Sequence, residues 1–343
     1  MDASDSGDRR QYAEQLERAA EEQRQAYRVF SDRSKPAEER RIALNKAVLR
    51  EQDQVAEALD VIHNTDEDDE LRASALHAID IEVGKRPDLV DMVIGLLRDS
   101  AGPEVLRLAA LRVLQQISFS GSAYYQKRAD IYDALRAVID DQDTSLRQEA
   151  LGILAQNHDE YAQRRLREGL EDSRQALVSP EKAIQLLGFD IHAEHYPILR
   201  GMVENPPSLE AKEEAVRLLA NDPASKDLLT ALLKNKHERQ GVRNASAAAL
   251  QSLAPAEFEE QAKEILYDTE EYNELRATAI NALTLFADQE ALDQDPELIG
   301  RIEQLREEAP SKEVERTANR FLRKQRRRRE QRNRSDGPRR ERG

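Results

Sequence analysis

The sequence predicts an all-α fold, a solenoid of stacked helix pairs. A nine-residue pattern recurs along the chain with starts 31 to 40 residues apart. Repeats of this length are typical of stacked helical units, because a single helix pair cannot bury its apolar face alone. No stretch has the alternating β-branched residues that would indicate a strand. The composition, 39% hydrophobic and 4% aromatic with no Trp, suits thin layers of Leu, Ala, Ile and Val.

The recurring pattern has its clearest copy from Leu146 to Leu154. Position 1 is apolar, position 2 is basic, position 5 is Ala, position 6 is apolar and position 9 is Leu. Positions 1, 5, 6 and 9 fall on one stripe of a helix, here called helix B of a repeat. A small residue at position 5 lets neighbouring helices approach closely. Nine copies start at Glu39, Leu71, Leu106, Leu146, Ser179, Ala211, Val242, Leu275 and Val314.

The N-terminal segment predicts a long helix. Residues 1–8 are small, polar and acidic, and we expect them to be disordered. Apolar or small residues then recur at steps of three or four, the spacing of one helix face. We expect this helix to cap the first repeat, with a coiled-coil partner helix as the alternative. The face comprises Tyr12, Leu16, Ala19, Ala26 and Phe30.

Turn signals divide the rest of the chain into helix pairs. Ser34-Lys35-Pro36 opens a helix that extends to about Leu49, and each later repeat reads as helix A, tight turn, helix B. Ser179-Pro180 places an N-cap residue before a proline at the first helical position. We therefore expect a repeat array over residues 9–325 and a basic disordered tail over residues 326–343. The other turns before helix B are 66–69, 99–103, 140–144, 206–208, 268–273 and 310–311.

These residues resemble HEAT repeats, in particular the short HEAT-like class of bacterial proteins and phycobilisome lyases. The matching features are the Asp-rich turn before helix B, the basic position 2 and the small position 5, over about residues 30–325. Pro180 and Glu315 interrupt the basic position. The resemblance implies a right-handed α-solenoid whose concave face binds another protein. The basic residues are Arg40, Arg72, Arg107, Arg147, Lys212, Arg243 and Arg276.

The basic residues at position 2 have two interpretations. In the first they are structural and bond the turn carboxylates and carbonyls of an adjacent repeat, with Asp99, Asp141 and Asp268 as acceptors. In the second they form a ligand-binding stripe. We expect positions 2, 3, 6 and 7 of helix B to be exposed and to contact a partner. In two repeats the contacting residues would include Arg107, Arg112, Arg147, Gln148 and Glu149.

An aromatic segment falls in the repeat with the 40-residue spacing, from Ser118 to Lys127. The additional residues predict a longer loop or an extended helix. Tyr124 and Tyr125 could anchor a partner there, since tyrosine is a frequent contact residue in protein interfaces. The alternative is that one of the tyrosines packs beneath the loop.

The charge is divided between an acidic body and a basic C-terminus. The net charge is −15, but residues 320–343 hold 12 Lys and Arg against 3 Asp and Glu. An acidic body would favour a basic partner and speed encounter at low salt. The tail could bind RNA or DNA phosphates, bind acidic lipid headgroups, or contact an acidic chain surface. The polyanion-binding candidates are Arg323, Lys324, Arg326, Arg327, Arg328 and Arg329.

Catalytic and metal-binding motifs are few. The chain has no Cys, so thiolate metal sites and cysteine nucleophiles are excluded. His237-Glu238 is the only His-Glu pair, whereas hydroxylases of the deoxyhypusine type need several to hold two irons. His192-Ala193-Glu194-His195 is one local cluster of possible metal ligands. A DNA glycosylase would need a basic aromatic groove, which an acidic body without Trp does not favour. We expect no enzymatic activity, no metal and no cofactor.

The sequence therefore favours a non-catalytic scaffold or adaptor that holds another protein on the concave face of the solenoid. The first alternative is a nucleic-acid-associated protein that docks through its Arg-rich tail. The second is a lyase-type enzyme of the HEAT-like class. No apolar segment predicts a membrane span or a secretory signal, so we expect a cytoplasmic protein.

Overall fold

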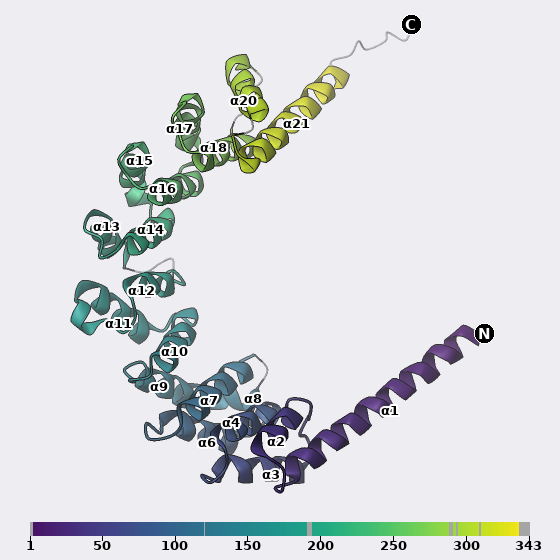
Figure 1. The fold of residues 1–343 in the computed structure, drawn as a ribbon. Helices are drawn as coiled ribbons and strands as arrows, with labels where there is room; N and C mark the ends of the chain where they lie inside the picture. Colours follow the sequence, from purple (N-terminus) through teal and green to yellow (C-terminus); the bar gives the residue numbers. More distant parts are fainter. Residues whose placement is uncertain are drawn as a thin grey trace. The chain divides into compact units, whose positions relative to one another are not determined.

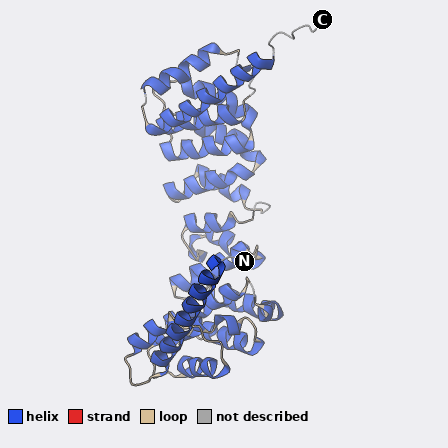
Figure 2. Cartoon of the chain, turned by 90° about the vertical axis from the view of Figure 1, so that its right-hand side faces the viewer, coloured by secondary structure: helices blue, strands red, loops and turns tan. Residues whose placement is uncertain are grey.

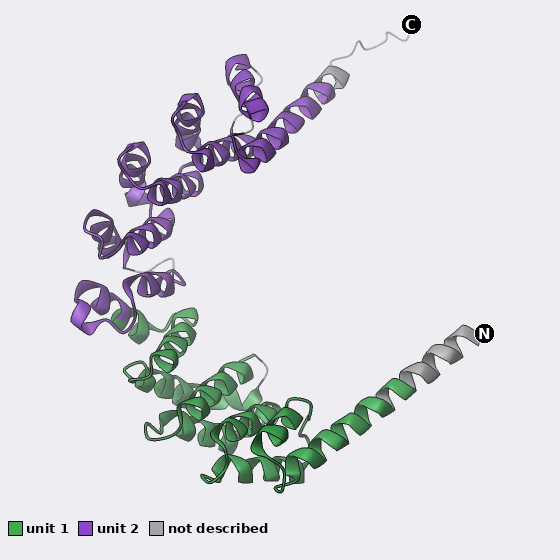
Figure 3. Cartoon of the chain, viewed as in Figure 1, with its two compact units in different colours: residues 1–165 green, residues 166–343 purple. Residues whose placement is uncertain are grey.

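The computed structural model describes residues 3–335, apart from 120, 191–193, 288–290, 293 and 309. Within these residues every regular element is helical, as Figure 2 shows. The chain divides into two compact units, Met1–Arg165 and Leu166–Gly343 (Figure 3). The prediction of an all-α solenoid is confirmed, because helix pairs follow one another along both units.

Unit 1 is a series of A and B helices (Figure 1). Each B helix packs against its A helix and against the B helix of the next repeat, so α2, α4, α7 and α10 form one layer. Helix α11 crosses the division between the units. The helices are α1 Ala3–Ser31, α2 Ala37–Leu44, α3 Gln52–His63, α4 Asp69–Ala78, α5 Asp80–Val83, α6 Pro87–Arg98, α7 Glu104–Ile117, α8 Ser122–Gln126, α9 Arg128–Val138, α10 Thr144–Gln156 and α11 Glu160–Glu171.

Unit 2 has the same organisation. Helices α12, α14, α16, α18 and α21 stack in order as B helices, with α13, α15, α17 and α20 packed against them. Short 3₁₀ turns connect some of the helices. The α-helices are α12 Pro180–Leu187, α13 Tyr196–Glu204, α14 Leu209–Leu218, α15 Lys226–Lys234, α16 Gln240–Leu253, α17 Pro255–Tyr267, α18 Asn273–Leu285, α20 Pro296–Glu308 and α21 Lys312–Ser335.

The small residue at position 5 lies inside the layer of B helices in every repeat. Ser246, the one hydroxyl among them, donates a hydrogen bond to the Val242 carbonyl at 2.9 Å, so its polar group is satisfied in the core. The nine residues at this position are all buried: Ala43, Ala75, Ala110, Ala150, Ala183, Ala215, Ser246, Ala279 and Ala318.

Several B helices begin at caps that the turn pattern predicts. The Asp143 carboxylate accepts hydrogen bonds from the backbone N–H groups of Ser145 and Leu146 at the start of α10. Ser208 caps α14, and Ser179 caps α12 with Pro180 at its first position. These side chains satisfy backbone donors that a helix start leaves free, so each turn fixes where the next helix begins.

Helix α1 packs on the array through its C-terminal turns. Phe30 and Ala26 are buried, and the Gln23 side chain accepts a hydrogen bond from the Val48 backbone at 2.6 Å. Ala19 is exposed, and the side chains of Tyr12 and Leu16 lie outside the described residues. Among the described side chains of the predicted apolar face, Ala26 and Phe30 are the ones buried against the array.

The termini differ from the domain limits expected from composition. Helix α1 begins at Ala3, inside the segment predicted to be disordered, and α21 runs to Ser335, past the predicted end of the repeats at residue 325. Residues 336–343 lie outside the described part of the chain. In that part, no helix is both long enough and apolar enough to cross a membrane.

Candidate functional site

The cations at position 2 of helix B join neighbouring repeats. Arg107 in α7 donates its Nε–H to the Leu97 carbonyl of α6 at 3.2 Å and its Nη2–H to Asp141 of the next repeat at 2.5 Å. Arg40 bonds the Phe30 carbonyl and Glu67 in the same way. We call this arrangement, with its third example at Arg243, the inter-repeat clasp.

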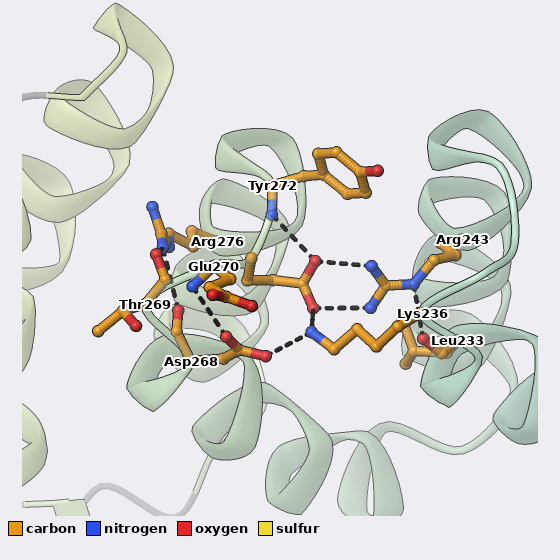
Figure 4. Close-up of polar contacts among 9 residues, drawn as sticks. Leu233, Lys236, Arg243, Asp268, Thr269, Glu270, Tyr272 and Arg276 are labelled. Carbon is orange, nitrogen blue, oxygen red and sulfur yellow. Dashed lines mark hydrogen bonds and ion pairs between the residues drawn. The ribbon is translucent and has the colours of Figure 1, made fainter.

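The Arg243 clasp is the most enclosed of the three (Figure 4). Its guanidinium bonds both oxygens of Glu271, at 2.7 and 2.6 Å, and its Nε–H reaches the Leu233 carbonyl at 2.9 Å. The two charged side chains are only 3% and 2% exposed. Lys236 donates to the same carboxylate at 2.6 Å and also pairs with Asp268, so two cations from one repeat hold two acids of the next.

The other cations at position 2 of helix B make different contacts from those in the three clasps. Lys212 reaches Glu238 of the following repeat at 2.6 Å. Arg72 bonds the Ile62 carbonyl at 3.0 Å but takes its carboxylate, Asp69, from its own turn. Two further arginines, Arg147 and Arg276, donate to turn carbonyls. The structural interpretation of these residues accounts for all the contacts that they make.

The expected exposure of positions 2 and 6 is wrong for the repeat of Arg107, whereas Arg147 at position 2 of the next repeat is half-buried. Arg107 is 6% exposed, because the clasp draws it between two repeats, and Leu111 at position 6 is buried in the layer. Arg112 and Gln148 are exposed, and the Arg112 guanidinium donates to Glu149 at 2.7 Å across α7 and α10. Arg107 therefore has no free donor face for a partner, whereas Arg112, Gln148 and Glu149 lie on accessible helix surface.

The clasp carboxylates make stability depend on pH. Hydrogen bonding from Arg107 holds the pKa of Asp141 below 3.8. Burial favours the neutral form of Glu271, but bonds from Arg243 and Lys236 outweigh it and hold its pKa below 4.5. A carboxylate with a lowered folded pKa stabilises the fold above its unfolded pKa, and that contribution is lost as pH falls through the folded pKa.

We therefore expect the free energy of unfolding, measured by urea titration, to fall as the pH is lowered below 4.5, the ordinary value for Glu271. In an Arg107→Gln variant the pKa of Asp141 returns toward its unfolded value. The variant should be less stable near neutral pH and should lose less stability on acidification. Equal acid-induced losses in the variant and the parent chain would show that this clasp does not set the dependence.

An aromatic groove lies at one edge of unit 1. It has a volume of about 420 Å³ and is formed where α7 and α10 end and α9 begins. The additional residues of the 40-residue spacing form α8, which supplies one wall. The groove is lined by Leu114, Gln115, Ser118, Phe119, Tyr124, Tyr125, Arg128, Ile131, Leu135, Ile153, Gln156 and Asn157.

The aromatic residues of the groove differ in exposure. Phe119 is 79% and Tyr125 69% exposed, while Tyr124 is buried beneath them. The two tyrosine rings meet edge to face with centroids 5.9 Å apart. Burial, together with the neighbouring Tyr132, raises the pKa of Tyr124 to about 12. Tyr124 thus supports the groove from below, and Tyr125 presents its ring at the surface.

A close backbone contact positions the aromatic wall. The turn after α7 is closed by a 2.7 Å bond from the Gly121 N–H to the Ile117 carbonyl, and the Ala123 N–H bonds the Gly84 carbonyl at 3.0 Å. A Cβ at Gly121 would lie 2.8 Å from the Ile117 carbonyl oxygen and 3.0 Å from the Gly84 Cα. Glycine at position 121 lets α8 dock on the preceding repeat, which places Tyr125 at the rim.

Sequence reasoning found the tyrosines but missed the other half of the groove. The Arg128 guanidinium lies over the Tyr132 ring at 5.3 Å, and Asn157 ends α10 with a bond to the Ile153 carbonyl at 2.8 Å. A second hollow of about 680 Å³ continues past Tyr125, Arg128 and Asn157 toward His158. These residues come from three helices, so no local spacing connects them.

The histidine cluster does not assemble a metal site in the part of the chain that the structure describes. His192 and Ala193 lie outside the described residues. His195 is buried against Tyr196, with ring centroids 4.8 Å apart, and burial lowers its pKa. Among the described residues, no three His, Cys, Asp or Glu side chains are grouped so that they could hold a metal ion.

The predicted polyanion-binding residues lie on α21 and divide between its faces. Arg323, Lys324, Arg327 and Arg328 line one hollow together with Arg320 and Gln331. Arg326 and Arg329 do not line it. The Lys324 ammonium donates to the Thr284 carbonyl at the end of α18, so this residue is partly used in packing the helix on the array.

The fold and its repeat joints define a HEAT-like α-solenoid. No family model and no curated protein matches the sequence. Human deoxyhypusine hydroxylase is similar at 17% identity and a TM-score of 0.32, over 72% of this chain and 98% of that one. A structure of Kap95p with RanGDP is similar at 14% identity and a TM-score of 0.49, over 85% of this chain and 44% of that one.

A third similar structure is the CpcE and CpcF complex of phycocyanin lyase from Nostoc sp. PCC7120. It matches at 17% identity and a TM-score of 0.25, over 79% of this chain and 94% of that one. The expectation that the chain is not an enzyme is corrected by these comparisons. A hydroxylase and a lyase are among the similar structures, so enzymes occur among helical-repeat proteins of this kind.

Proposed function

We propose that this protein is a helical-repeat scaffold that binds a partner protein at the aromatic groove of unit 1. The observation that carries the proposal is the exposure of Phe119 and Tyr125 around a preformed hollow. Large aromatic side chains that fill or line pockets supply a disproportionate share of the binding energy in protein interfaces. The exposed Ile81 lines a smaller hollow on the preceding repeat, next to Gly121, which extends the apolar edge.

The chemistry of the groove favours a partner segment with an apolar anchor flanked by Lys or Arg. The walls are apolar at Phe119, Tyr125 and Ile153. Among the described lining residues the one charged side chain is Arg128, so the groove takes the apolar anchor and the basic residues of the partner lie outside it. Helices α7 and α10 both end at this groove, and the C-terminal end of a helix carries partial negative charge. The net negative charge of the chain also attracts a basic partner.

Selection of peptides from a random library on the full chain tests this function. We expect enrichment of sequences with an aromatic or long aliphatic residue next to Lys or Arg. The Phe119→Ala/Tyr125→Ala variant should bind the enriched peptide at least about 30-fold more weakly, because truncation of a hot-spot residue costs about 2 kcal/mol or more. Isothermal titration calorimetry measures both affinities.

A matched control uses two exposed apolar residues of unit 2. Leu285 and Phe286 are 57% and 51% exposed. The Leu285→Ala/Phe286→Ala variant should bind the same peptide with unchanged affinity. Equal loss in both variants, or enrichment of peptides with no shared pattern, would contradict the groove as the binding site.

A second candidate function is polyanion binding through the C-terminal helix. The observation that favours it is the gathering of five cations around one hollow of α21. In the three clasps, by contrast, each arginine is paired with a carboxylate.

A further inference from the structure

The cations of α21 form a continuous stripe on one helix face. Residues at positions i, i+3, i+4, i+7, i+8 and i+11 share a face, and the six residues around the hollow have this spacing. The hollow among their side chains measures about 450 Å³. We call this set the α21 stripe; it comprises Arg320, Arg323, Lys324, Arg327, Arg328 and Gln331.

The charges of the stripe are not neutralised within the described residues. No ion pair to a carboxylate is found there for any of its five cations, in contrast to the clasp arginines. Arg323 donates to the Asn319 carbonyl, and Lys324 to the Thr284 carbonyl. The Nη1 of Arg328 is buried and has no hydrogen-bond partner. Burial and the nearby charge of Arg328 lower the pKa of Lys324, as expected where cations are crowded.

A bound anion would relieve this crowding. Leaving a buried charged donor without an acceptor is costly, and an oxyanion supplies acceptors for several donors at once. Arginine forks match phosphate oxygens in pairs, which gives geometric as well as electrostatic complementarity. The Arg328 Nη1 has no acceptor among the described residues, and an anion oxygen would supply one.

The length of the stripe favours a row of phosphates over a single ion. From Arg320 to Gln331 the helix rises about 16 Å, at roughly 1.5 Å per residue. A nucleic-acid strand carries one charge about every 3.4 Å of helix axis, so several phosphates fit along this distance. No aromatic residue lines the hollow, so the stripe has no platform for base stacking.

A membrane surface fits the same helix poorly. A helix that lies in a lipid interface needs an apolar face opposite its cations. Here Phe321 is buried in the core of unit 2, and Arg326 and Arg329, which do not line the hollow, place further charge on α21 outside the stripe. The helix thus carries charge outside the stripe as well, and the stripe has no apolar surface to insert.

We propose that the α21 stripe binds the phosphate backbone of nucleic acid without reading its sequence. The inference rests on the second candidate function and assigns its ligand class and its residues. It does not depend on the aromatic groove, which lies in the other unit. Recognition of the backbone alone implies strong dependence on salt and little preference among sequences.

The test compares two double variants of the full chain with equal charge change. Arg323→Gln/Arg327→Gln removes two stripe cations, and Arg326→Gln/Arg329→Gln removes two cations from outside the stripe. Fluorescence anisotropy of a labelled oligouridylate is measured over a range of salt concentrations. The stripe variant should bind roughly tenfold more weakly, with a salt slope reduced by about 1.4, or about 0.7 per lost phosphate contact. The other variant should change affinity less than about twofold.

The possible outcomes distinguish the assignment of the α21 stripe from the broader proposal that α21 binds polyanions. Equal weakening in both variants would overturn the stripe while polyanion binding by the helix stands. Binding of heparin or of phosphatidylserine vesicles, but not of oligouridylate or duplex DNA, would overturn the nucleic-acid assignment. Binding of none of these probes would remove the second candidate function as well. Circular dichroism of both variants checks that α21 remains helical.

Discussion

Replacing Arg243 by Met is expected to lower the free energy of unfolding by about 3 kcal/mol. The substitution removes the two bonds to the buried Glu271 carboxylate and the bond to the Leu233 carbonyl. Lys236 stays within reach of that carboxylate, but it is about half exposed and cannot replace the fork of the guanidinium. Breaking one half of a buried pair is costly because the other charge stays buried. Urea unfolding followed by circular dichroism measures the loss.

An exposed ion pair provides the matched control. Arg112 pairs with Glu149 between α7 and α10, and its side chain is 55% exposed. Arg112→Met should cost less than about 1 kcal/mol, as is usual for surface pairs. The double variant Arg243→Met/Glu271→Leu should recover part of the stability that the single variant loses, since no buried carboxylate remains. Equal losses of the free energy of unfolding for Arg243→Met and Arg112→Met would mean that burial does not make the clasp more important for stability than an exposed ion pair.

The second large effect is expected for Ala279→Leu, which should destabilise the chain by about 1–3 kcal/mol. Ala279 is buried at position 5 of α18, the helix that packs against α16, α17 and α21. A leucine there forces the packed helices apart or pushes side chains out of their preferred rotamers. Thermal and urea unfolding measure the change.

The control for overpacking is an alanine on the surface of the same unit. Ala256 lies in the first turn of α17 and is exposed. Ala256→Leu should change the free energy of unfolding by less than about 0.5 kcal/mol, as is typical of surface substitutions. If Ala279→Leu were as mild as Ala256→Leu, the small residue at position 5 would not be what sets the spacing between B helices.

The repeat architecture could be predicted because it depends on local patterns that the chain states many times. Ala150 and Ala279 fall at the same place in their copies of the pattern, and both are buried between B helices. The turn residues Asp143 and Ser208 predict helix starts because capping is decided within three residues. Because the pattern recurs in many copies, an ambiguous residue in one copy does not change the predicted architecture.

The sequence indicated Asp141 and Asp268 as acceptors, and both bind clasp cations. It did not show which cation each would bind, and it missed Glu67 and Glu271. Arg107 bonds Asp141, which is 34 residues away, and the sequence offers many acids at similar distances. The clasp also hides the guanidinium between repeats, so a residue expected at the surface lies inside. Pairing across repeats depends on how helices stack, and a one-dimensional pattern does not contain that geometry.

The aromatic groove and the α21 stripe could be predicted from the sequence only in part, because their composition also depends on how residues are arranged in space. Tyr125 stands out locally, but its neighbours Arg128 and Asn157 come from other helices and are ordinary residues in isolation. In the tail, composition alone favoured disorder beyond residue 325. Only the helical phase of α21 separates Arg327, which lines the hollow, from its neighbour Arg326.

The inter-repeat clasp also bears on how such a chain can lengthen during evolution. A clasp takes its cation from one repeat and its carboxylate from the next, as in Arg107 with Asp141 and Arg243 with Glu271. The repeat that contains Glu238 and Arg243 holds both an acceptor for the preceding repeat and a donor for the next, so a tandem duplication of this repeat would give the new junction both halves. Duplication of a fragment would leave one half alone. Genes that encode repeats of this kind can gain or lose length in whole repeats while the junctions between those repeats keep their ion pairs.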